Sequence, residues 1–401
     1  MKKKFVSIVA AALVALPLLG HAAPVKIGFI NSITGKEAQI GENLTNGAAM
    51  AIEDLKAKGI QVELIREDDG GDPKNALAAY EKLVTRDGVI GVVGPYTSGA
   101  ANVVASRADQ YQVPILVPAA AKEDITMKGY KNVFRLNAPA NVYSSVLMSA
   151  VASYKPKTIA YVYAATDFGV STVKTAQENA AKMGLKEVAN EKYQQGQPDY
   201  RPSLAKVKAA NPDLIFLVSY DADAILLMRQ SKEIGLTPKA FLGAGAGYTT
   251  AQFAQQSEIS NLVVSATQWT DDVNWPGAAD FGKRYKAKFA KEPSYHAACA
   301  YEAMRIMVET ASKNNTSAKL RAGLKAGSWN GILGPVKFAD YSGFTNQNNH
   351  PMLVQQIING KYETVFPAKF SKKKLVYPFT PVSSRRIRVP ENPVPKRLHH
   401  L

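Results

Sequence analysis

The sequence predicts an α/β fold with doubly wound parallel sheets, and two observations support this prediction. Between Val25 and about Val264, short apolar runs alternate with amphipathic helical patterns, as they do in consecutive βαβ units. The apolar runs contain few polar residues, which is typical of parallel strands buried on both faces. With 401 residues, the chain is long enough for two domains of ordinary size.

Seven apolar runs are expected to be strands, with helices between them. The strand candidates are VKIGFI (25–30), QVELIRE (61–67), GVIGVVG (88–94), VPILVP (113–118), TIAYVYA (158–164), DLIFLVS (213–219) and AFLGAG (240–245). Three helical patterns end at Gly59, Gly184 and Gly235, because glycine takes the left-handed conformation that ends a helix at little cost. Asp72 and Pro73 stand where an N-cap and a first helical residue are expected.

The pattern changes after about Thr267, where a loop bearing tryptophan and proline begins. We expect three helices after this loop, followed by strands. The helices are expected near 278–290, 295–313 and 317–326, and the strands at 334–344 and 350–366. The last strands should form a hairpin around Asn359 and Gly360, since Asn-Gly favours the tight turns that join antiparallel strands.

Both ends of the chain differ from the part between them. A basic start, an apolar core and the small-residue stretch GHAAP predict a secretory signal peptide over residues 1–22, because the apolar run is too short for a membrane span. No cysteine follows the apolar core, so we do not expect a lipid anchor. Residues 378–401 are basic, rich in proline and without hydrophobic periodicity. We expect them to be a disordered tail that adds nothing to the core.

The formal net charge of +16 at pH 7 raises the question of nucleic-acid binding. Much of the excess lies at the ends, with three lysines in residues 1–22 and eight Lys or Arg against one acid in residues 371–401. The remaining lysines are scattered among acids, and no basic run alternates with aromatic residues. We therefore expect no nucleic-acid partner.

The sequence lacks the residue patterns that metal binding and cofactor binding require. Apart from both ends, the chain has two histidines, His296 and His350, and one cysteine, Cys299, so zinc-binding patterns are missing. A single cysteine cannot form an internal disulfide, and we expect Cys299 to be a buried small hydrophobe. GAGAGY at 243–248 follows a strand but has Tyr248 where the dinucleotide motif needs glycine. We expect neither a metal nor a cofactor.

The turn GPYTSGAA, at 94–101, follows one predicted strand and opens a predicted helix. Ser98 has three candidate roles there: helix cap, nucleophile, or a group that holds a ligand reversibly. Its context is T-S-G rather than the G-x-S-x-G of hydrolases, although histidines distant in sequence can be close in space. A hydroxyl beside free N–H groups at a helix N-terminus suits a carboxylate. Doubly wound sheets also bind ligands at the carboxyl ends of their strands.

Five longer stretches carry a family resemblance. They are VKIGFINSITGKEAQIGENLTNGAAMAIEDLKAKG, REDDGGDPKNALAAYEKLV, GPYTSGAANVVASRADQYQVPILVPAA, YVYAATDFGVSTVKTAQENAAKMG and DLIFLVSYDADAILLMRQSKEIGL. Together they are highly specific, although no single one is. Over about residues 25–370 the chain resembles the type I periplasmic solute-binding proteins of the leucine/isoleucine/valine-binding group, which deliver substrates to ABC importers.

The resemblance implies two α/β Rossmann-like lobes that are joined by three crossovers and enclose a ligand. On this basis we expect lobe 1 to contain residues 23–138 and 268–338, and lobe 2 to contain residues 139–267 and 339–377. It also implies a protein that is not an enzyme, binds by hinge closure and presents its closed form to a membrane permease. We expect a periplasmic monomer.

The resemblance further implies a set of ligand contacts. Ser98 matches the hydroxyl residue that holds the ligand carboxylate, and Tyr220 matches a tyrosine of the second lobe. Phe168 stands where an aromatic wall residue, commonly tyrosine, is found. The residues carried over are Tyr96, Thr97, Ser98, Ala119, Ala121, Phe168, Tyr220 and Gly245.

Two positions depart from the amino-acid binders of the family. Ala121 stands where threonine is usual, and Gly245 stands where an acid pairs with the ligand ammonium. Burying an ammonium without its counter-charge costs several kcal/mol. The ligand therefore stays open between an amino acid held by another acid and a small carboxylate or amide, with aromatic acids as leading candidates of the second kind.

Four acids near these positions in sequence are expected to cap helices and face solvent rather than line the cleft. They are Asp221, Asp223, Asp271 and Asp272. Two other functions also stay open. A ligand-sensing regulator or receptor lobe uses the same fold, although a regulator usually lacks a signal peptide and a receptor continues into a membrane span. A serine hydrolase would use Ser98 as its nucleophile.

Overall fold

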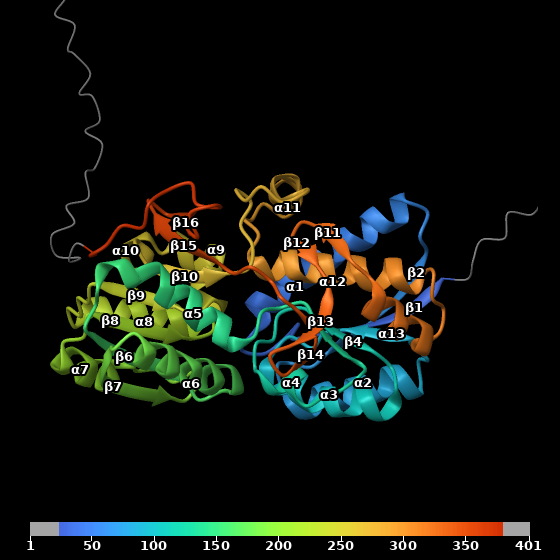
Figure 1. The fold of residues 1–401 in the computed structure, drawn as a ribbon, viewed down its shortest axis with the longest axis horizontal. Coiled ribbons are helices and arrows are strands. Elements are labelled where there is room, and N and C mark those ends of the chain that lie inside the picture. The colour runs from blue at the N-terminus through green and yellow to red at the C-terminus, as the bar shows by residue number, and fades with distance from the viewer. Residues whose placement is uncertain (1–23, 380–401) are drawn as a thin grey trace, which may run out of the picture.

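The computed structural model describes residues 24–379, which form two lobes lying side by side (Figure 1). Each lobe contains a seven-stranded sheet flanked by helices. The signal peptide expected over residues 1–22, and residues 380–401 of the expected tail, lie outside the described residues. Within residues 24–379 we find no helix with the length and hydrophobicity needed to cross a bilayer.

Lobe 1 is built on a mainly parallel sheet. In the order of pairing, its strands are β13 (Phe338–Tyr341), β14 (Phe344–Asn348), β5 (Val133–Arg135), β4 (Ile115–Val117), β3 (Gly91–Val93), β1 (Val25–Asn31) and β2 (Val62–Asp68). Its helices are α1 (Ala38–Ala57), α2 (Pro73–Thr85), α3 (Ser98–Tyr111), α4 (Asp124–Met127), α11 (Ala278–Phe289), α12 (Tyr295–Ala311) and α13 (Ser317–Ala326). A two-stranded ribbon, β11 (Trp329–Gly331) with β12 (Gly334–Val336), follows α13.

Lobe 2 repeats this arrangement. In the order of pairing, its strands are β16 (Lys361–Phe366), β15 (Leu353–Ile358), β10 (Val264–Thr267), β9 (Ala240–Gly243), β8 (Leu214–Val218), β6 (Thr158–Ala164) and β7 (Lys186–Tyr193). Its helices are α5 (Ala140–Val151), α6 (Asp167–Lys182), α7 (Arg201–Ala210), α8 (Asp221–Glu233), α9 (Ala251–Gln255) and α10 (Ser257–Ser260). Short 3-10 turns are η1 (Ala152–Tyr154) and η2 (Ala246–Thr249).

Local signals in the sequence predict many of these elements correctly. Asp72 caps α2 by accepting the N–H of Lys74 at 2.7 Å, and Pro73 is the first helical residue. Asn359 and Gly360 have φ of 53° and 77° and join the antiparallel strands β15 and β16. The predicted helices after residue 277 are also present as α11, α12 and α13. Each of these features depends on a few neighbouring residues.

Four strands lie wholly outside the predicted ranges. β5, β10 and β11 contain polar residues, namely Arg135, Ser265 and Asn330, and therefore lack a continuous apolar run. β7 lies at the edge of its sheet, and its sequence KEVANEKY leaves most side chains partly or fully exposed. An edge strand exposed in this way needs no continuous apolar run, so the rule that finds buried parallel strands misses it.

The chain passes between the lobes three times, after β5, after β10 and after β14. This confirms the fold of two α/β lobes joined by three crossovers. The boundary expected at residues 338 and 339 is wrong, because β13 and β14 belong to the sheet of lobe 1. Gln347 of β14 accepts a hydrogen bond at 2.5 Å from the fully buried guanidinium of Arg135 in β5, which needs such acceptors.

The packed part of the chain also continues beyond the predicted start of the tail at residue 378. Phe379 is buried, and its N–H donates to the carbonyl of Lys239 at 2.8 Å. Its ring packs on Phe241 with the centroids 6.4 Å apart. Tyr377, just before it, stacks on Tyr154. Pro378 and Phe379 are therefore part of lobe 2, because one aromatic anchor is enough to hold a segment whose composition predicts a free tail.

Gln268 joins the three crossovers to one another. Its side-chain oxygen accepts the N–H of Ala138, in the first crossover, at 3.0 Å. Its backbone carbonyl bonds Nε2 of His350, in the third crossover, at 2.7 Å. Its side-chain amide donates to the hydroxyl of Tyr143 at 2.9 Å, and that hydroxyl donates to Asn137 at 2.9 Å. Burial lowers the pKa of His350 to about 4, so the imidazole is neutral at pH 7 and its Nε2 is the donor.

Helix α12 packs along α1 in lobe 1, and its first residue, Tyr295, reaches the cleft between the lobes. Every residue of α12 except Arg305 and Glu309 is buried. At Gly47 of α1 the two backbones come so close that a Cβ would lie 2.0 Å from the carbonyl oxygen of Ala297. A glycine is therefore required for this approach. Cys299, also in α12, is fully buried as predicted.

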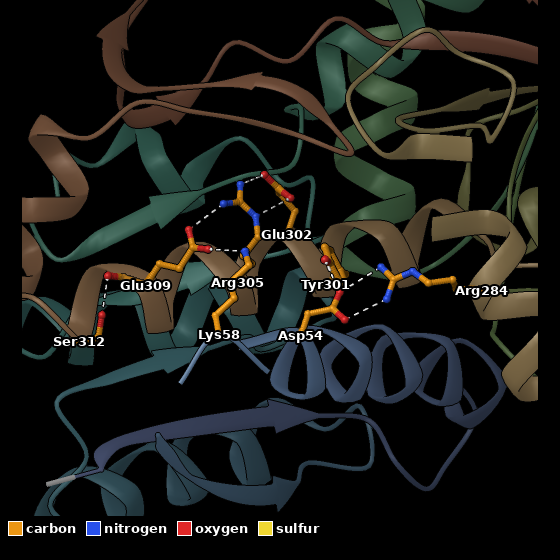
Figure 2. Close-up of polar contacts among 8 residues, drawn as sticks. All are labelled: Asp54, Lys58, Arg284, Tyr301, Glu302, Arg305, Glu309 and Ser312. Carbon is orange, nitrogen blue, oxygen red and sulfur yellow. Dashed lines mark hydrogen bonds and ion pairs between the residues drawn. The ribbon is translucent and has the colours of Figure 1, made fainter. Parts of the chain in front are cut away.

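Two groups of charges hold α12 and α11 to α1 (Figure 2). Asp54 of α1 accepts two hydrogen bonds from Arg284, at 2.9 and 3.0 Å, and one from the Tyr301 hydroxyl at 2.7 Å. Glu309 of α12 pairs with Lys58 of α1 at 3.4 Å. Within α12, Arg305 bonds Glu309 at 2.7 Å and pairs with the fully buried Glu302. These contacts hold the middle and the C-terminal part of α12 against α1.

Replacing Asp54 by asparagine should destabilise the fold by about 1 kcal/mol at neutral pH, because the partly exposed Arg284 loses a charged partner that solvent already screens. Burial opposes ionisation, but hydrogen bonds from Arg284 and Tyr301 outweigh it and hold the pKa of Asp54 below its usual 3.8. Because the pKa of Asp54 is lowered in the folded state, its carboxylate stabilises the fold at pH values above 3.8. This stabilisation is lost as the pH falls through the folded-state pKa. Urea unfolding at several pH values measures both effects.

The variant and the wild type should therefore converge in unfolding free energy at pH values well below 3.8. Asp280→Asn is the matched control, because Asp280 bonds the same arginine from a side chain that is 66% exposed. Its effect at neutral pH should be smaller than that of Asp54→Asn. A loss in Asp54→Asn that stays constant into strong acid would contradict the electrostatic explanation.

Candidate functional site

The turn between β3 and α3 is held by two hydroxyl residues with different roles. Thr97 is the N-cap of α3, and its hydroxyl accepts the N–H of Ala100 at 3.3 Å. Ser98 is the first helical residue, and its Oγ accepts the N–H groups of Ala121 and Lys122, each at 3.2 Å. Of the three candidate roles of Ser98, that of helix cap therefore belongs to Thr97 instead. The oxygen of Ser98 ties the start of α3 to the loop after β4.

A small cavity lies between the lobes at the carboxyl ends of the central strands. We call it the central cavity. It encloses about 10 Å³, about what one water molecule needs. Its lining residues are Tyr96, Ser98, Ala119, Ala120, Phe168, Tyr220, Ala246 and Tyr295. Five of the eight predicted site residues are among them, namely Tyr96, Ser98, Ala119, Phe168 and Tyr220.

The other three predicted residues are neighbours of the lining rather than part of it. Thr97 and Ala121 flank lining residues in sequence, and both are buried. Gly245 has a φ of 75°, and a Cβ added there would lie 2.8 Å from the Tyr143 ring and 3.2 Å from the Tyr295 hydroxyl. The backbone at Gly245 thus touches the aromatic wall directly, and there is no room for the acidic side chain that the resemblance implies at this position.

The wall of the central cavity is largely aromatic and joins both lobes. Tyr96 of lobe 1 meets Tyr220 of lobe 2 edge-on, with ring centroids 6.2 Å apart. Phe168 packs on Tyr220 at 6.1 Å and on Tyr143 at 6.2 Å. Burial raises the pKa of Tyr96 and Tyr220 above the usual 10. These tyrosines are therefore neutral at physiological pH, and the wall combines apolar rings with uncharged hydroxyls.

Tyr295 and His296, at the start of α12, are site residues that the sequence prediction misses. Tyr295 lines the central cavity, and its hydroxyl accepts the N–H of Ala246 at 3.4 Å. His296 stacks on Tyr295 at 3.9 Å and meets Tyr96 edge-on at 5.5 Å. The available signal was the start of a strongly predicted helix with an aromatic pair. Nothing local shows that this helix end points between the lobes.

No arrangement for nucleophilic catalysis surrounds Ser98 in the described part of the chain. Its two partners are backbone N–H groups, and no imidazole is bonded to it. Burial lowers the pKa of His296 to about 3, and its Nδ1 bonds the hydroxyl of Ser294. His350 is bonded to Gln268. Across residues 24–379, no group of three or more His, Cys, Asp or Glu side chains is placed to hold a metal.

The four acids that the sequence places near the site do not line the central cavity. Asp221 and Asp223 lie in the first turn of α8 and accept hydroxyl groups, from Thr250 and Tyr200 respectively. Burial raises the pKa of Asp221 to about 6. Asp272 accepts the hydroxyl of Thr364 at 2.6 Å. The expectation that these acids cap helices and face solvent is wrong for Asp221 and Asp223, because both are buried and the N-cap of α8 is Tyr220. Asp271 is exposed, as expected.

A second, larger cavity of about 720 Å³ lies on the other side of Tyr295, which lines both cavities. It is bounded by α11, by α9 and by the β15–β16 hairpin. Its charged lining residues have both signs, and two of them, Lys286 and Glu292, pair with each other. It contains none of the predicted site residues, so its size alone does not make it the ligand site.

The lobes touch across the cleft through polar side chains as well. Lys122 of lobe 1 pairs with Asp167 of lobe 2 at 2.8 Å. Lys36 donates to the carbonyl of Gln195 at 2.9 Å, and the Gln195 side chain donates to Glu37 at 2.8 Å. Lys36 and Glu37 follow β1, whereas Gln195 follows β7. These contacts close the side of the central cavity that lies farthest from the crossovers.

The fold and this interlobe site agree with comparisons to known proteins. A family model described as "Periplasmic binding protein" matches residues 24–361 of the chain. The chain belongs to this family. The Leu/Ile/Val-binding protein homolog 7 of Brucella suis biovar 1 is 26% identical over 390 residues, which cover 92% of this chain and 97% of that protein.

Solved structures of the family share the fold at lower sequence identity. The branched-chain amino acid transporter substrate-binding protein LivJ of Streptococcus pneumoniae, solved with isoleucine, superposes with a TM-score of 0.77 at 24% identity and covers 86% of this chain and 100% of that one. A solute-binding protein of an ABC transporter from Rhodopseudomonas palustris, solved with 3,4-dihydroxybenzoic acid, has a TM-score of 0.78 at 22% identity, covering 88% and 98%.

Replacing Gly245 by alanine should destabilise this periplasmic binding protein by roughly 2 kcal/mol or more. A positive φ costs alanine about 1 kcal/mol, and the added Cβ would press on Tyr143, which overpacks the wall. Gly59→Ala is the matched control, because Gly59 has a φ of 80° but no heavy atom within 4 Å of the added Cβ. Chemical unfolding of both variants separates the cost of a positive φ from the additional cost at Gly245, which comes from its ψ of −145° and from the clash. Equal losses would show that the wall yields freely at Gly245.

Proposed function

We propose that this protein is the substrate-binding component of an ABC importer and that it binds a small amino acid, or a related small carboxylate or amide, between its lobes. The central cavity is the observation that carries this proposal. Helices α3, α6 and α8 begin at Ser98, Asp167 and Asp221, beside or within its lining. The positive ends of helices favour a carboxylate, and the buried rings offer an apolar surface for the rest of the ligand.

Names and ligands of the relatives support this ligand class. The Brucella relative is named as a homologue of Leu/Ile/Val-binding proteins. One structural neighbour holds isoleucine and another holds 3,4-dihydroxybenzoic acid. Both compounds carry a carboxylate, and one is aliphatic with an ammonium while the other is aromatic without one. The ligand of this chain lies within that range.

Ligand entry requires the lobes to move apart. A cavity of about 10 Å³ is far smaller than an amino acid or an aromatic acid. The three crossovers are the segments that permit such movement, and the contacts across the cleft come from both lobes. We infer hinge opening and closure, with the closed form recognised by a membrane permease. The protein would act without catalysis, as a monomer, in the periplasm after removal of the signal peptide.

Removing the Ser98 hydroxyl should weaken ligand binding by roughly 1.5–3 kcal/mol, the range for a hydrogen bond to a charged group. A thermal-shift panel of amino acids, deaminated analogues, aromatic acids and small amides would first find the ligand, since a ligand at about 100 times its Kd adds about 2.7 kcal/mol. Calorimetric titration of Ser98→Ala then measures the loss. Ser106→Ala is the control, because the hydroxyl of Ser106 bonds only the carbonyl of Val103 in the same helix.

Unchanged affinity in Ser98→Ala would show that the hydroxyl serves only the loop after β4. Turnover of an ester or amide by the wild type, lost in Ser98→Ala, would favour the hydrolase instead. A regulator or receptor lobe would bind the ligand equally well, so this alternative is tested by transport. Deletion of the gene should abolish uptake of the ligand found in the panel.

Small-angle X-ray scattering should show a smaller radius of gyration when the ligand found in the panel is added. Hinge closure brings two rigid lobes together, and the crossovers change conformation while each sheet keeps its structure. The comparison is made at saturating ligand and with Ser98→Ala as the weak-binding control. An identical scattering profile with and without ligand would refute the hinge mechanism.

A further inference from the structure

Glu37 is a buried carboxylate in the cleft between the lobes, outside the lining of the central cavity. It lies in the loop between β1 and α1, is 7% exposed, and has no lysine, arginine or histidine within ion-pair distance among the described residues. Its Oε1 accepts a hydrogen bond from the side chain of Gln195 in lobe 2 at 2.8 Å. Lys36, next to it in sequence, donates to the Gln195 carbonyl instead. The negative charge of Glu37 is thus covered by the opposite lobe, and the exposed Lys36 offsets it from a distance without forming an ion pair.

A second buried carboxylate, Asp69, lies behind Glu37 at the end of β2. Asp69 is fully buried, and its Oδ1 accepts the hydroxyl of Ser32 and the N–H of Gly71, each at 2.8 Å. Its Oδ2 has no hydrogen-bond partner. Burial raises the pKa of both carboxyl groups, and their mutual repulsion adds to the effect for Glu37. Two buried acids without an ion-pair partner create a site that favours positive charge.

Glu37 is also coupled to the residues of the central cavity. Its Oε2 lies against Gly71, where an added Cβ would be 2.2 Å away. The carbonyl of Gly71 is 3.4 Å from the hydroxyl of Thr97, which directly precedes Ser98. After burial, which is the largest cause, the charge of Glu37 contributes to raising the pKa of both Tyr96 and Tyr220. Through Gly71, the carboxylate is therefore one contact away from the turn at Thr97 that carries Ser98.

The position where the resemblance implies an acid is glycine here, and its surroundings leave no room for a side chain. We propose that Glu37 instead binds a protonated amino group of the ligand, so that the ligand is a small zwitterionic amino acid rather than a simple carboxylate. This inference rests on the proposed function, with the ligand carboxylate at Ser98. The amino group points toward the end of β1, and Gln195 closes over Glu37 from lobe 2.

Calorimetric titration with matched compounds tests this assignment. The probes are L-leucine and L-phenylalanine, each paired with its deaminated acid, 4-methylpentanoate or 3-phenylpropanoate. In the wild type, the amino acids should bind more tightly than the acids. Glu37→Gln keeps the size of the side chain but removes its charge, and it should weaken amino-acid binding about 30-fold or more, as loss of a buried charge partner does. Binding of the deaminated acids should change by less than about threefold.

Two further variants separate charge from lobe closure. Gln195→Ala removes the hydrogen bond across the cleft while leaving Glu37 in place, so it should weaken amino acids and deaminated acids by the same factor. Glu37→Asp keeps the charge and should preserve the preference for amino acids, and it serves if Glu37→Gln does not fold. Thermal melts of each variant without ligand check folding.

The outcomes separate this inference from the proposed function. If wild type binds deaminated acids as tightly as amino acids, or if Glu37→Gln weakens both equally, Glu37 does not recognise an amino group, and the importer function stands. If neither kind of compound binds, with the panel extended to all proteinogenic amino acids and aromatic acids, the proposed ligand class is wrong and the Glu37 assignment is wrong with it.

Discussion

The buried side chain and carbonyl of Gln268 impose the constraint on which the two-lobed arrangement depends. One residue bonds to Ala138 and His350 in the other two crossovers, and to Tyr143. A buried amide must keep its hydrogen bonds, so the three connecting segments cannot bend independently of one another. Tyr143 extends the constraint to the site, because its ring touches Phe168 and limits the space at Gly245. Lobe orientation and cavity shape are therefore coupled through a few hydrogen bonds.

The cleft is also polarised along its length. The N-termini of α3, α6 and α8 bring positive potential to the middle of the cleft. The buried carboxylates of Glu37 and Asp69 bring negative potential to the end farthest from the crossovers. A ligand with one charge satisfies half of this pattern, whereas a zwitterion satisfies both halves without leaving a buried charge unpaired.

Sequence patterns predict what depends on neighbouring residues. The Asp72–Pro73 helix start, the Asn359–Gly360 turn and the fully buried strands are all read from local composition and are present in the structure. The resemblance to a known family adds the lobes and most of the cavity lining. Tyr295 was missed because its role depends on where α12 ends in space. Glu37 was missed because a glutamate before a helix is common at surfaces, and only the opposite lobe buries it.

The two hydrogen bonds that Ser98 accepts have a consequence for selectivity. A hydroxyl oxygen has two lone pairs and one proton, and the N–H groups of Ala121 and Lys122 occupy both lone pairs. The remaining tetrahedral direction belongs to the proton, which has no freedom to rotate toward another partner. Ser98 therefore meets an incoming molecule only as a donor. A ligand atom that accepts hydrogen bonds, such as a carboxylate oxygen, can bind at this position. A ligand N–H group would face the proton of Ser98, so its binding is disfavoured even where the group fits sterically.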